Sequence, residues 1–137
     1  MIDYGTVVEE RTYVLNTGAS LTEYLEAYEG IGLPAQKPIL GGFLGYFVTE
    51  LGTQNQLVHL WMYPDLEERR RRRALLAADP EWQRCLSIIR PMIMTMENRI
   101  MYPTRFSPIR SLPVSAADPH TAFTLEVDAT PTSGEPA

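Results

Sequence analysis

The chain has 137 residues, the size of one ordinary domain, and is long enough to bury a core without disulfides or metal. Hydrophobic residues make up 45% and charged residues 21%, as in a globular protein, and no apolar run approaches the roughly 20 residues of a membrane-spanning helix. The net charge of -5 disfavours a nucleic-acid partner, and the single cysteine, Cys85, excludes an internal disulfide.

The first half of the sequence predicts a strand, a helix and a connector. Residues 7–15, VVEERTYVL, mix β-branched and aromatic residues with charges at roughly alternate positions, which indicates a strand. The sequence before it has no basic flank followed by an apolar stretch, so a cytoplasmic location is expected. Residues 19–30 place apolar residues on one helix face, and Gly30 is expected to end that helix. Residues 31–42, with two prolines and three glycines, are expected to form a connector that contains at most a short helical turn.

Two apolar runs, residues 43–51 and 56–63, then predict a β-hairpin closed by the four residues from Gly52 to Asn55. The second run is apolar on both of its alternating faces. Each side of the sheet should therefore be covered by helices or by another sheet.

The second half predicts two successive helices and a last strand. Asp65 and Asp79 are suitable N-caps, and a proline follows Asp79 at the first helical position. Residues 94–101 alternate as a strand does. We expect residues 1–108 to form the domain and residues 109–137 to be a loosely held, proline-rich tail in which only 122–127 can form a strand.

The predicted order of elements is β-α-β-β-α-β, which is the split arrangement of a ferredoxin-like α+β sandwich with both helices on one face of an antiparallel sheet. The other face would remain bare. A second copy of the chain, related by a twofold axis, is the simplest cover for it. We therefore predict a homodimer whose sheets meet face to face.

Several stretches, in this order, resemble the NIPSNAP family over about residues 7–108. They are ERTYVL, LGYFVTELG, NQLVHLWMYPDLEERRRRR, DPEWQ, and MENRI before PTRFSP. The resemblance implies a dimeric α+β barrel with a small-molecule cleft between sheet and helices in each subunit. It does not imply one defined reaction, since proteins of that fold include cofactor-free monooxygenases, isomerases and proteins without known activity.

Five consecutive arginines, Arg69 to Arg73, raise the question of a nucleic-acid site. On a helix successive residues turn by about 100°, so the five side chains wrap the circumference and form no single stripe. Glutamates stand four residues before Arg71 and before Arg72, the spacing of stabilising ion pairs. We expect a solvated, ion-paired helix without a nucleic-acid partner, on which Arg70 or Arg73 can bend inward to an anionic ligand or an acidic neighbour.

His59 lies inside the apolar run LVHLWMY and is the first candidate for catalysis. With an ordinary pKa of about 6.5, it can act as a general base or bind a substrate. The alternative is a structural histidine satisfied by a backbone carbonyl or a carboxylate. Because the only other histidine, His120, lies in the tail, no metal site is expected.

Polar residues in the first and last strands are expected to approach His59 and one another: Glu9, Glu10, Arg11, Glu97, Asn98 and Arg99. Arg11 and Arg99 are candidates to stabilise negative charge during catalysis, and Glu97 is a candidate to contact substrate. In the expected strand order these residues can approach His59. The same charges, if buried, must be paired, and can equally form a salt-bridged network at the dimer interface.

Aromatic residues, among them Tyr13, Tyr46 and Trp61, are expected to wall the cleft, which suits a planar organic molecule. The sequence thus predicts a homodimer that binds a small molecule without metal, nucleotide or flavin. As an enzyme it would isomerise, cyclise or oxygenate an aromatic or enolisable substrate, with His59 moving the proton. The alternative is a non-catalytic binding or adaptor dimer.

Overall fold

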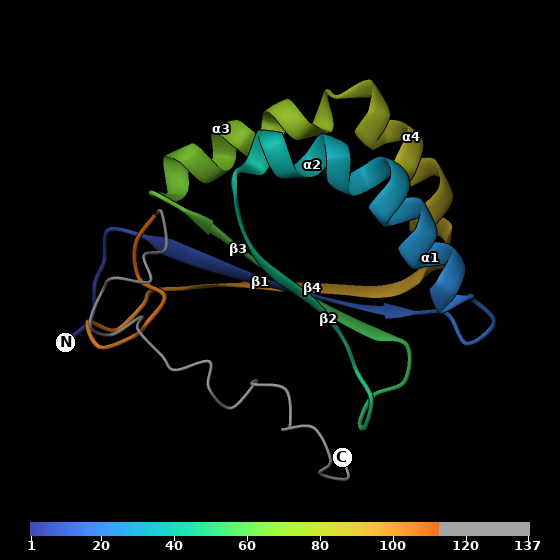
Figure 1. The fold of residues 1–137 in the computed structure, drawn as a ribbon, viewed down its shortest axis with the longest axis horizontal. Coiled ribbons are helices and arrows are strands. Elements are labelled where there is room, and N and C mark those ends of the chain that lie inside the picture. The colour runs from blue at the N-terminus through green and yellow to red at the C-terminus, as the bar shows by residue number, and fades with distance from the viewer. Residues whose placement is uncertain (113–137) are drawn as a thin grey trace, which may run out of the picture.

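A computed structural model describes residues 1–112 as one four-stranded antiparallel sheet with every helix of this part of the chain on one face (Figure 1). The strands lie in the order β2-β3-β1-β4 and are β1 (Val7–Leu15), β2 (Gly42–Val48), β3 (Gln56–Tyr63) and β4 (Ile93–Met101). The helices are α1 (Leu21–Ala27), a π-helical turn (Tyr28–Gly32), α2 (Leu33–Leu40), α3 (Leu66–Ala77), α4 (Pro80–Ile89) and a 3-10 turn (Arg90–Met92). The predicted ferredoxin-like arrangement is confirmed.

The burial of β1 shows how its sequence distinguishes the two faces of the sheet. Its odd-numbered residues, from Val7 to Leu15, are buried beneath the helices, and its even-numbered residues are only partly covered. We call these two sides the helix face and the open face. Because successive side chains of a strand point to opposite faces, Glu9 and Arg11 lie on the helix face in a row that is otherwise apolar or aromatic.

The segment between β1 and β2 is more helical than its sequence predicts. The helix does not end at Gly30, because α1 continues through the π-helical turn into α2. Pro34 lies in the first turn of α2, where proline is tolerated. Gly32 lets α4 approach closely, since a Cβ at this position would lie 2.7 Å from the Sγ of Cys85. The prediction of a connector was wrong because helix packing outweighed the local effect of glycine and proline.

The second half of the chain folds as expected, with the two helices starting at their predicted caps. The Asp65 carboxylate accepts a hydrogen bond of 2.7 Å from the Glu68 N–H, and that of Asp79 accepts one of 2.9 Å from the Trp82 N–H. The hairpin is confirmed, but β2 ends at Val48, earlier than predicted, so its loop is longer than four residues.

One hydrophobic core lies between the sheet and the helices. Its fully buried side chains include Tyr24, Leu57, Trp61 and Cys85. The thiol of Cys85 fills space there, as expected, and burial raises its pKa. The open face has no helical cover within residues 1–112 (Figure 1), although Met62 on that face is fully buried.

After β4 the chain returns to its own N-terminal end. Ile2 and Thr104 form an isolated β-bridge, and the Arg105 N–H donates to the Met1 carbonyl at 2.8 Å. The predicted strand at 122–127 lies outside the described residues. Within residues 1–112 no helix is long and apolar enough to cross a membrane.

Candidate functional site

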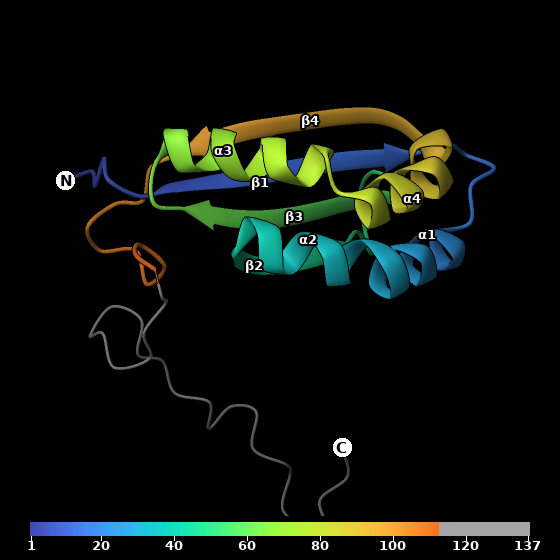
Figure 2. The same cartoon turned by 90° about the horizontal axis from the view of Figure 1, so that it is seen from above.

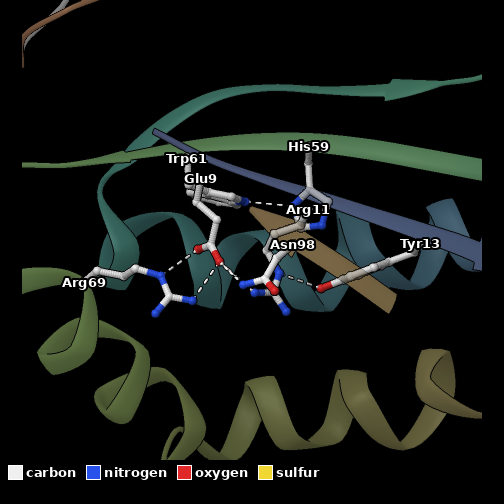
Figure 3. Close-up of polar contacts among 7 residues, drawn as sticks. All are labelled: Glu9, Arg11, Tyr13, His59, Trp61, Arg69 and Asn98. Atoms are coloured by element: carbon white, nitrogen blue, oxygen red, sulfur yellow. Dashed lines mark hydrogen bonds and ion pairs between the residues drawn. The ribbon is translucent and has the colours of Figure 1, made fainter. Parts of the chain in front are cut away.

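A row of polar side chains crosses three neighbouring strands on the helix face, beneath the helices (Figure 3). In the strand register Arg11 of β1 stands opposite His59 of β3 on one side and Asn98 of β4 on the other. Helix α3 adds arginines to this row. We define the helix-face polar cluster by the residues that take part in it: Glu9, Arg11, His59, Tyr63, Arg69, Arg73 and Asn98.

Glu9 is the centre of the cluster and is fully buried. Arg69 binds it in a bidentate manner, with Nε donating to Oε1 at 3.1 Å and Nη2 to Oε2 at 2.7 Å. Arg11 Nη1 and Asn98 Nδ2 also donate to Oε2, at 3.1 and 2.8 Å. Burial alone would raise the pKa of Glu9, but these hydrogen bonds and the two guanidinium charges lower it to about 2. Glu9 is therefore ionised, and all its hydrogen bonds go to residues of the cluster.

Arg11 connects the cluster to the aromatic residues. Its Nε donates a hydrogen bond of 2.9 Å to the hydroxyl of Tyr13, while Nη1 reaches Glu9. With only 9% of its surface exposed, Arg11 keeps its charge because Tyr13 and Glu9 raise its pKa against the effect of burial. Its guanidinium is thus held in one position before any ligand arrives.

His59 is buried and its ring is fixed from three sides. Tyr46 stacks on it with ring centroids 4.4 Å apart, and Tyr13 meets it edge-on at 4.9 Å. The indole Nε1–H of Trp61 donates to Nδ1 of His59 at 2.7 Å. Because an indole nitrogen only donates, Nδ1 is the acceptor and the neutral ring carries its proton on Nε2. Burial, and then the charges of Arg11 and Arg73, lower the pKa of His59 to about 3, so the ring is neutral at pH 7.

Three buried side-chain atoms in residues 1–112 have no hydrogen-bond partner, and all three belong to the cluster. They are Nε2 of His59, the hydroxyl of Tyr63 and Nη1 of Arg73. The positive charge of Arg73 acts on both of the other groups. Buried polar groups without partners are uncommon and call for an explanation, such as a ligand or ordered water.

The five arginines of α3 are divided between solvent and protein. Arg71 and Arg72 both pair with Glu68, and only the second pair was predicted. Arg70 is exposed and pairs with Glu67 at 3.7 Å. Arg72 also donates to the Leu40 carbonyl at 3.0 Å. Arg69 and Arg73, one helical turn apart, face the sheet, where Arg69 binds Glu9 and Nη1 of Arg73 is buried. Arg73 is thus the inward arginine of the two proposed.

Five predicted site residues lie together on the helix face: Arg11, Tyr13, Tyr46, His59 and Trp61. Glu97 and Arg99 do not join them. In β4 they alternate with Asn98 and so project from the open face, where Arg99 pairs with Glu10 at 2.8 Å. The expected approach of these two residues to His59 therefore does not occur.

Tyr63 and Arg69 were not predicted to lie at a site, and Glu9 and Asn98 were expected near His59 but were given no role. The alternation of β1 contained a signal for Glu9, because it is two residues from Val7 and from Arg11 on the same strand face. The equivalent signal in α3 was weaker. Arg69 and Arg73 share the helix side of Leu76, the buried residue of α3, but five adjacent arginines concealed that spacing.

The fold and the buried cluster define a ferredoxin-like α+β protein with a polar site beneath its helices. A NIPSNAP family model matches residues 8–108, and the chain belongs to the NIPSNAP family.

Known relatives agree with this assignment. The chain is 33% identical over 66 residues to Protein NipSnap of Drosophila melanogaster, a match that covers 48% of this chain and only 24% of that longer protein. A NIPSNAP family protein of unknown function from Agrobacterium tumefaciens is 44% identical with a TM-score of 0.73, over 77% of this chain and 95% of that one. SnoaB, a cofactor-independent oxygenase from Streptomyces nogalater, is 17% identical with a TM-score of 0.51, over 80% and 98%. The last similarity concerns the fold alone.

Proposed function

We propose that this protein is a homodimer in which each subunit binds a small organic molecule at the helix-face polar cluster and catalyses proton transfer on an aromatic or enolisable substrate without a cofactor. One observation carries the proposal. The cluster contains one buried carboxylate and three guanidinium groups, two of which belong to partly exposed residues. It has buried polar atoms without partners on His59, Tyr63 and Arg73. We place the protein in the cytoplasm as part of the same proposal.

Catalysis is supported by how firmly the cluster is held. Glu9 fixes Arg11 and Arg69, Trp61 fixes the ring of His59, and Tyr13 fixes the other side of Arg11. Donors that are already oriented in a poorly solvated site stabilise charge as it develops in a transition state. Arg11 and Arg73 take the role of stabilising negative charge, because Arg99 lies on the other face of the sheet.

The homodimer is supported by the open face. Apolar side chains such as Val58, Leu60 and Phe47 lie on it, and Phe47 is 55% exposed. Within residues 1–112 no helix covers this surface (Figure 1). Exposed apolar surface of this kind marks an interface, and a second copy of the same sheet is complementary to it in both shape and chemistry.

The alternative is a binding or adaptor dimer without catalysis, and one observation favours it. Every hydrogen bond of Glu9 goes to a residue of the cluster, as in a network that only stabilises the fold. Both functions give a dimer. They differ in whether the cluster changes the rate of a reaction.

Deuterium exchange at an enolisable carbon tests the proposal. Phenylpyruvate, an aromatic and enolisable probe, is incubated in D2O, and loss of its methylene proton signal is followed by NMR. The wild-type protein should accelerate exchange in proportion to its concentration, and His59→Gln should lower that acceleration at least about tenfold. Glu10→Gln on the open face is the matched control and should leave the rate unchanged. Equal rates for wild type and His59→Gln exclude His59 as a donor that stabilises the developing enolate, and no acceleration by either favours the non-catalytic dimer.

A further inference from the structure

We infer that the molecule bound at the helix-face polar cluster carries an oxyanion group, which the Arg73 guanidinium and the Nε2–H of His59 receive. The inference rests on the proposed binding function and adds the chemical class of the ligand. It also assigns His59 the role of a hydrogen-bond donor in place of a base.

The cluster has more positive than negative charges. Arg11, Arg69 and Arg73 bring three positive charges to the cluster, and Glu9 is the carboxylate that faces them. A carboxylate has about four lone-pair sites, and Arg69, Arg11 and Asn98 already donate four hydrogen bonds to Glu9. Three of these bonds go to Oε2 and one goes to Oε1, and none of them comes from Arg73. Nη1 of Arg73 is buried without a partner. A cationic group that is buried in this way is unfavourable, and an anionic ligand removes that penalty.

The three unpartnered atoms of the cluster are all hydrogen-bond donors. The proton of His59 is on Nε2, because Nδ1 accepts the hydrogen bond from Trp61. The phenol of Tyr63 is protonated, since burial and the charge of Glu9 raise its pKa to about 12. Together with Nη1 of Arg73, all three atoms are therefore able to donate. Each of these donors can bind a ligand atom that only accepts, which is the character of an oxyanion, and the charge of Arg73 acts on both of the other groups.

The apolar part of the ligand is expected to lie at the β4 edge of the sheet. Strand β4 forms the outer edge of the sheet (Figure 2), and the next residue of its helix-face row beyond Asn98 is Met96. The Met96 side chain is 48% exposed, and Met96 is the register partner of Tyr13. Met94, which is 58% exposed, follows at the register shift of this strand. An apolar or aromatic body can rest on flexible thioether groups at this edge while its charged group points inward.

Three probes of matched shape test the charge requirement: phenylacetate, phenyl phosphate and the neutral phenylacetamide. Binding is followed by NMR on the indole Nε1–H of Trp61, which touches His59 directly and is assigned with a Trp82→Phe variant. We expect at least one anion to shift this resonance in a saturable way and phenylacetamide to bind at least about tenfold more weakly. Tighter binding of phenyl phosphate or of phenylacetate identifies the oxyanion as a phosphate ester or a carboxylate.

Arg73→Met is the critical variant, with Arg70→Met as its matched control on the exposed side of the same helix. Arg73→Met should weaken anion binding at least about tenfold. It should also raise the melting temperature of the ligand-free protein by roughly 3 °C, because it removes a partly buried positive charge whose Nη1 has no hydrogen-bond partner. Arg70→Met should change neither quantity. If Arg73 only stabilises the fold, Arg73→Met should instead lower the melting temperature, and that outcome overturns the inference.

Two further outcomes separate this inference from the function on which it rests. If phenylacetamide binds as tightly as the anions, the cluster is a small-molecule site without a charge requirement, and only the inference fails. If none of the three probes shifts the Trp61 signal, the inference and the proposed binding site both fail. Long-range 1H–15N spectra of the ligand-free protein give the protonated nitrogen of His59 directly, and a proton on Nδ1 overturns its role as donor.

Discussion

Glu9 is a single buried carboxylate that holds two arginines from different elements, Arg11 of β1 and Arg69 of α3. Glu9→Gln should therefore lower the free energy of unfolding by about 3 kcal/mol, because both guanidinium groups lose their counter-charge inside the protein. Urea unfolding at a fixed protein concentration measures the change.

Glu10→Gln is the matched control for that experiment. Glu10 is the next residue of the same strand, but its partner Arg99 is 68% exposed on the open face. Its loss should change the free energy of unfolding by less than about 1 kcal/mol. Equal effects of the two substitutions would show that Glu9 is not the centre of a buried network.

His59 makes the stability of the protein depend on pH in a specific interval. Its pKa is about 3 in the folded protein, where burial and the charges of Arg11 and Arg73 oppose protonation, and 6.5 when unfolded. Between these values only the unfolded chain binds the proton, so stability is fully present above pH 6.5 and falls as the pH is lowered. The charge of Glu9 acts on the same ring in the opposite direction, and Tyr13 and Tyr46 are the neighbouring phenols.

We expect the wild-type protein to lose about 2 kcal/mol more than His59→Gln between pH 7 and pH 5. Urea unfolding curves of both proteins at these two pH values give the difference. Titration of the carboxylates is common to both proteins and cancels. Parallel pH profiles would mean that His59 is protonated as easily in the folded protein as in the unfolded chain.

The helical segment after β1 is longer than its sequence predicts, and substitutions at Gly32 and Gly30 test the reason. A Cβ on Gly32 would lie 2.7 Å from the Sγ of Cys85 and 3.0 Å from Cδ2 of Tyr28, whereas a Cβ on Gly30 meets nothing within 4 Å. Gly32→Ala should lower the free energy of unfolding by about 2 kcal/mol, because α4 must move away.

Gly30→Ala, in the same π-helical turn, is the control for this experiment. It should be neutral or stabilising by about 0.5 kcal/mol, since it only reduces the freedom of the unfolded chain. Thermal unfolding of the two variants distinguishes close packing from local helix preference. If both alanines have the same effect, Gly32 has no special role at the contact with α4.

Elements whose ends depend on neighbouring residues were predicted from sequence, and elements that depend on packing were not. The caps at Asp65 and Asp79 satisfy N–H groups three residues away, so short sequence windows contain all the information that they need. The segment from Tyr28 to Leu40 depends instead on contacts with α4, which is distant in sequence. Its prolines and glycines therefore gave a misleading prediction.

For the whole molecule, the open face is the surface on which the proposed dimer depends. Leu60 lies in its centre, opposite Glu10 in register. Leu60→Lys should convert the dimer to a monomer at micromolar concentration, because an ammonium group cannot be buried against a second apolar sheet. The new charge lies beside Glu10, so the subunit itself should remain folded.

Sedimentation velocity measures the mass, and far-UV circular dichroism reports the fold. Leu75→Lys is the control, since Leu75 is 52% exposed on α3, on the helical side of the molecule. It should leave the dimer intact. A wild-type protein that sediments as a single chain would remove the dimer from the proposal without affecting the cluster within the subunit.

The order of the four strands, the helices α1, α3 and α4, and membership of the NIPSNAP family could be read from the sequence alone. These properties follow from periodicity and short-range signals, which act between residues close together in the chain. Which charges meet depends instead on the three-dimensional fold. Glu9 and Arg69 are 60 residues apart and Glu9 and Asn98 are 89 apart, while Arg99, next to Asn98, faces the other side of the sheet. Pairings between distant segments depend on register and on helix rotation, and one residue of difference in a strand moves a charge to the opposite face.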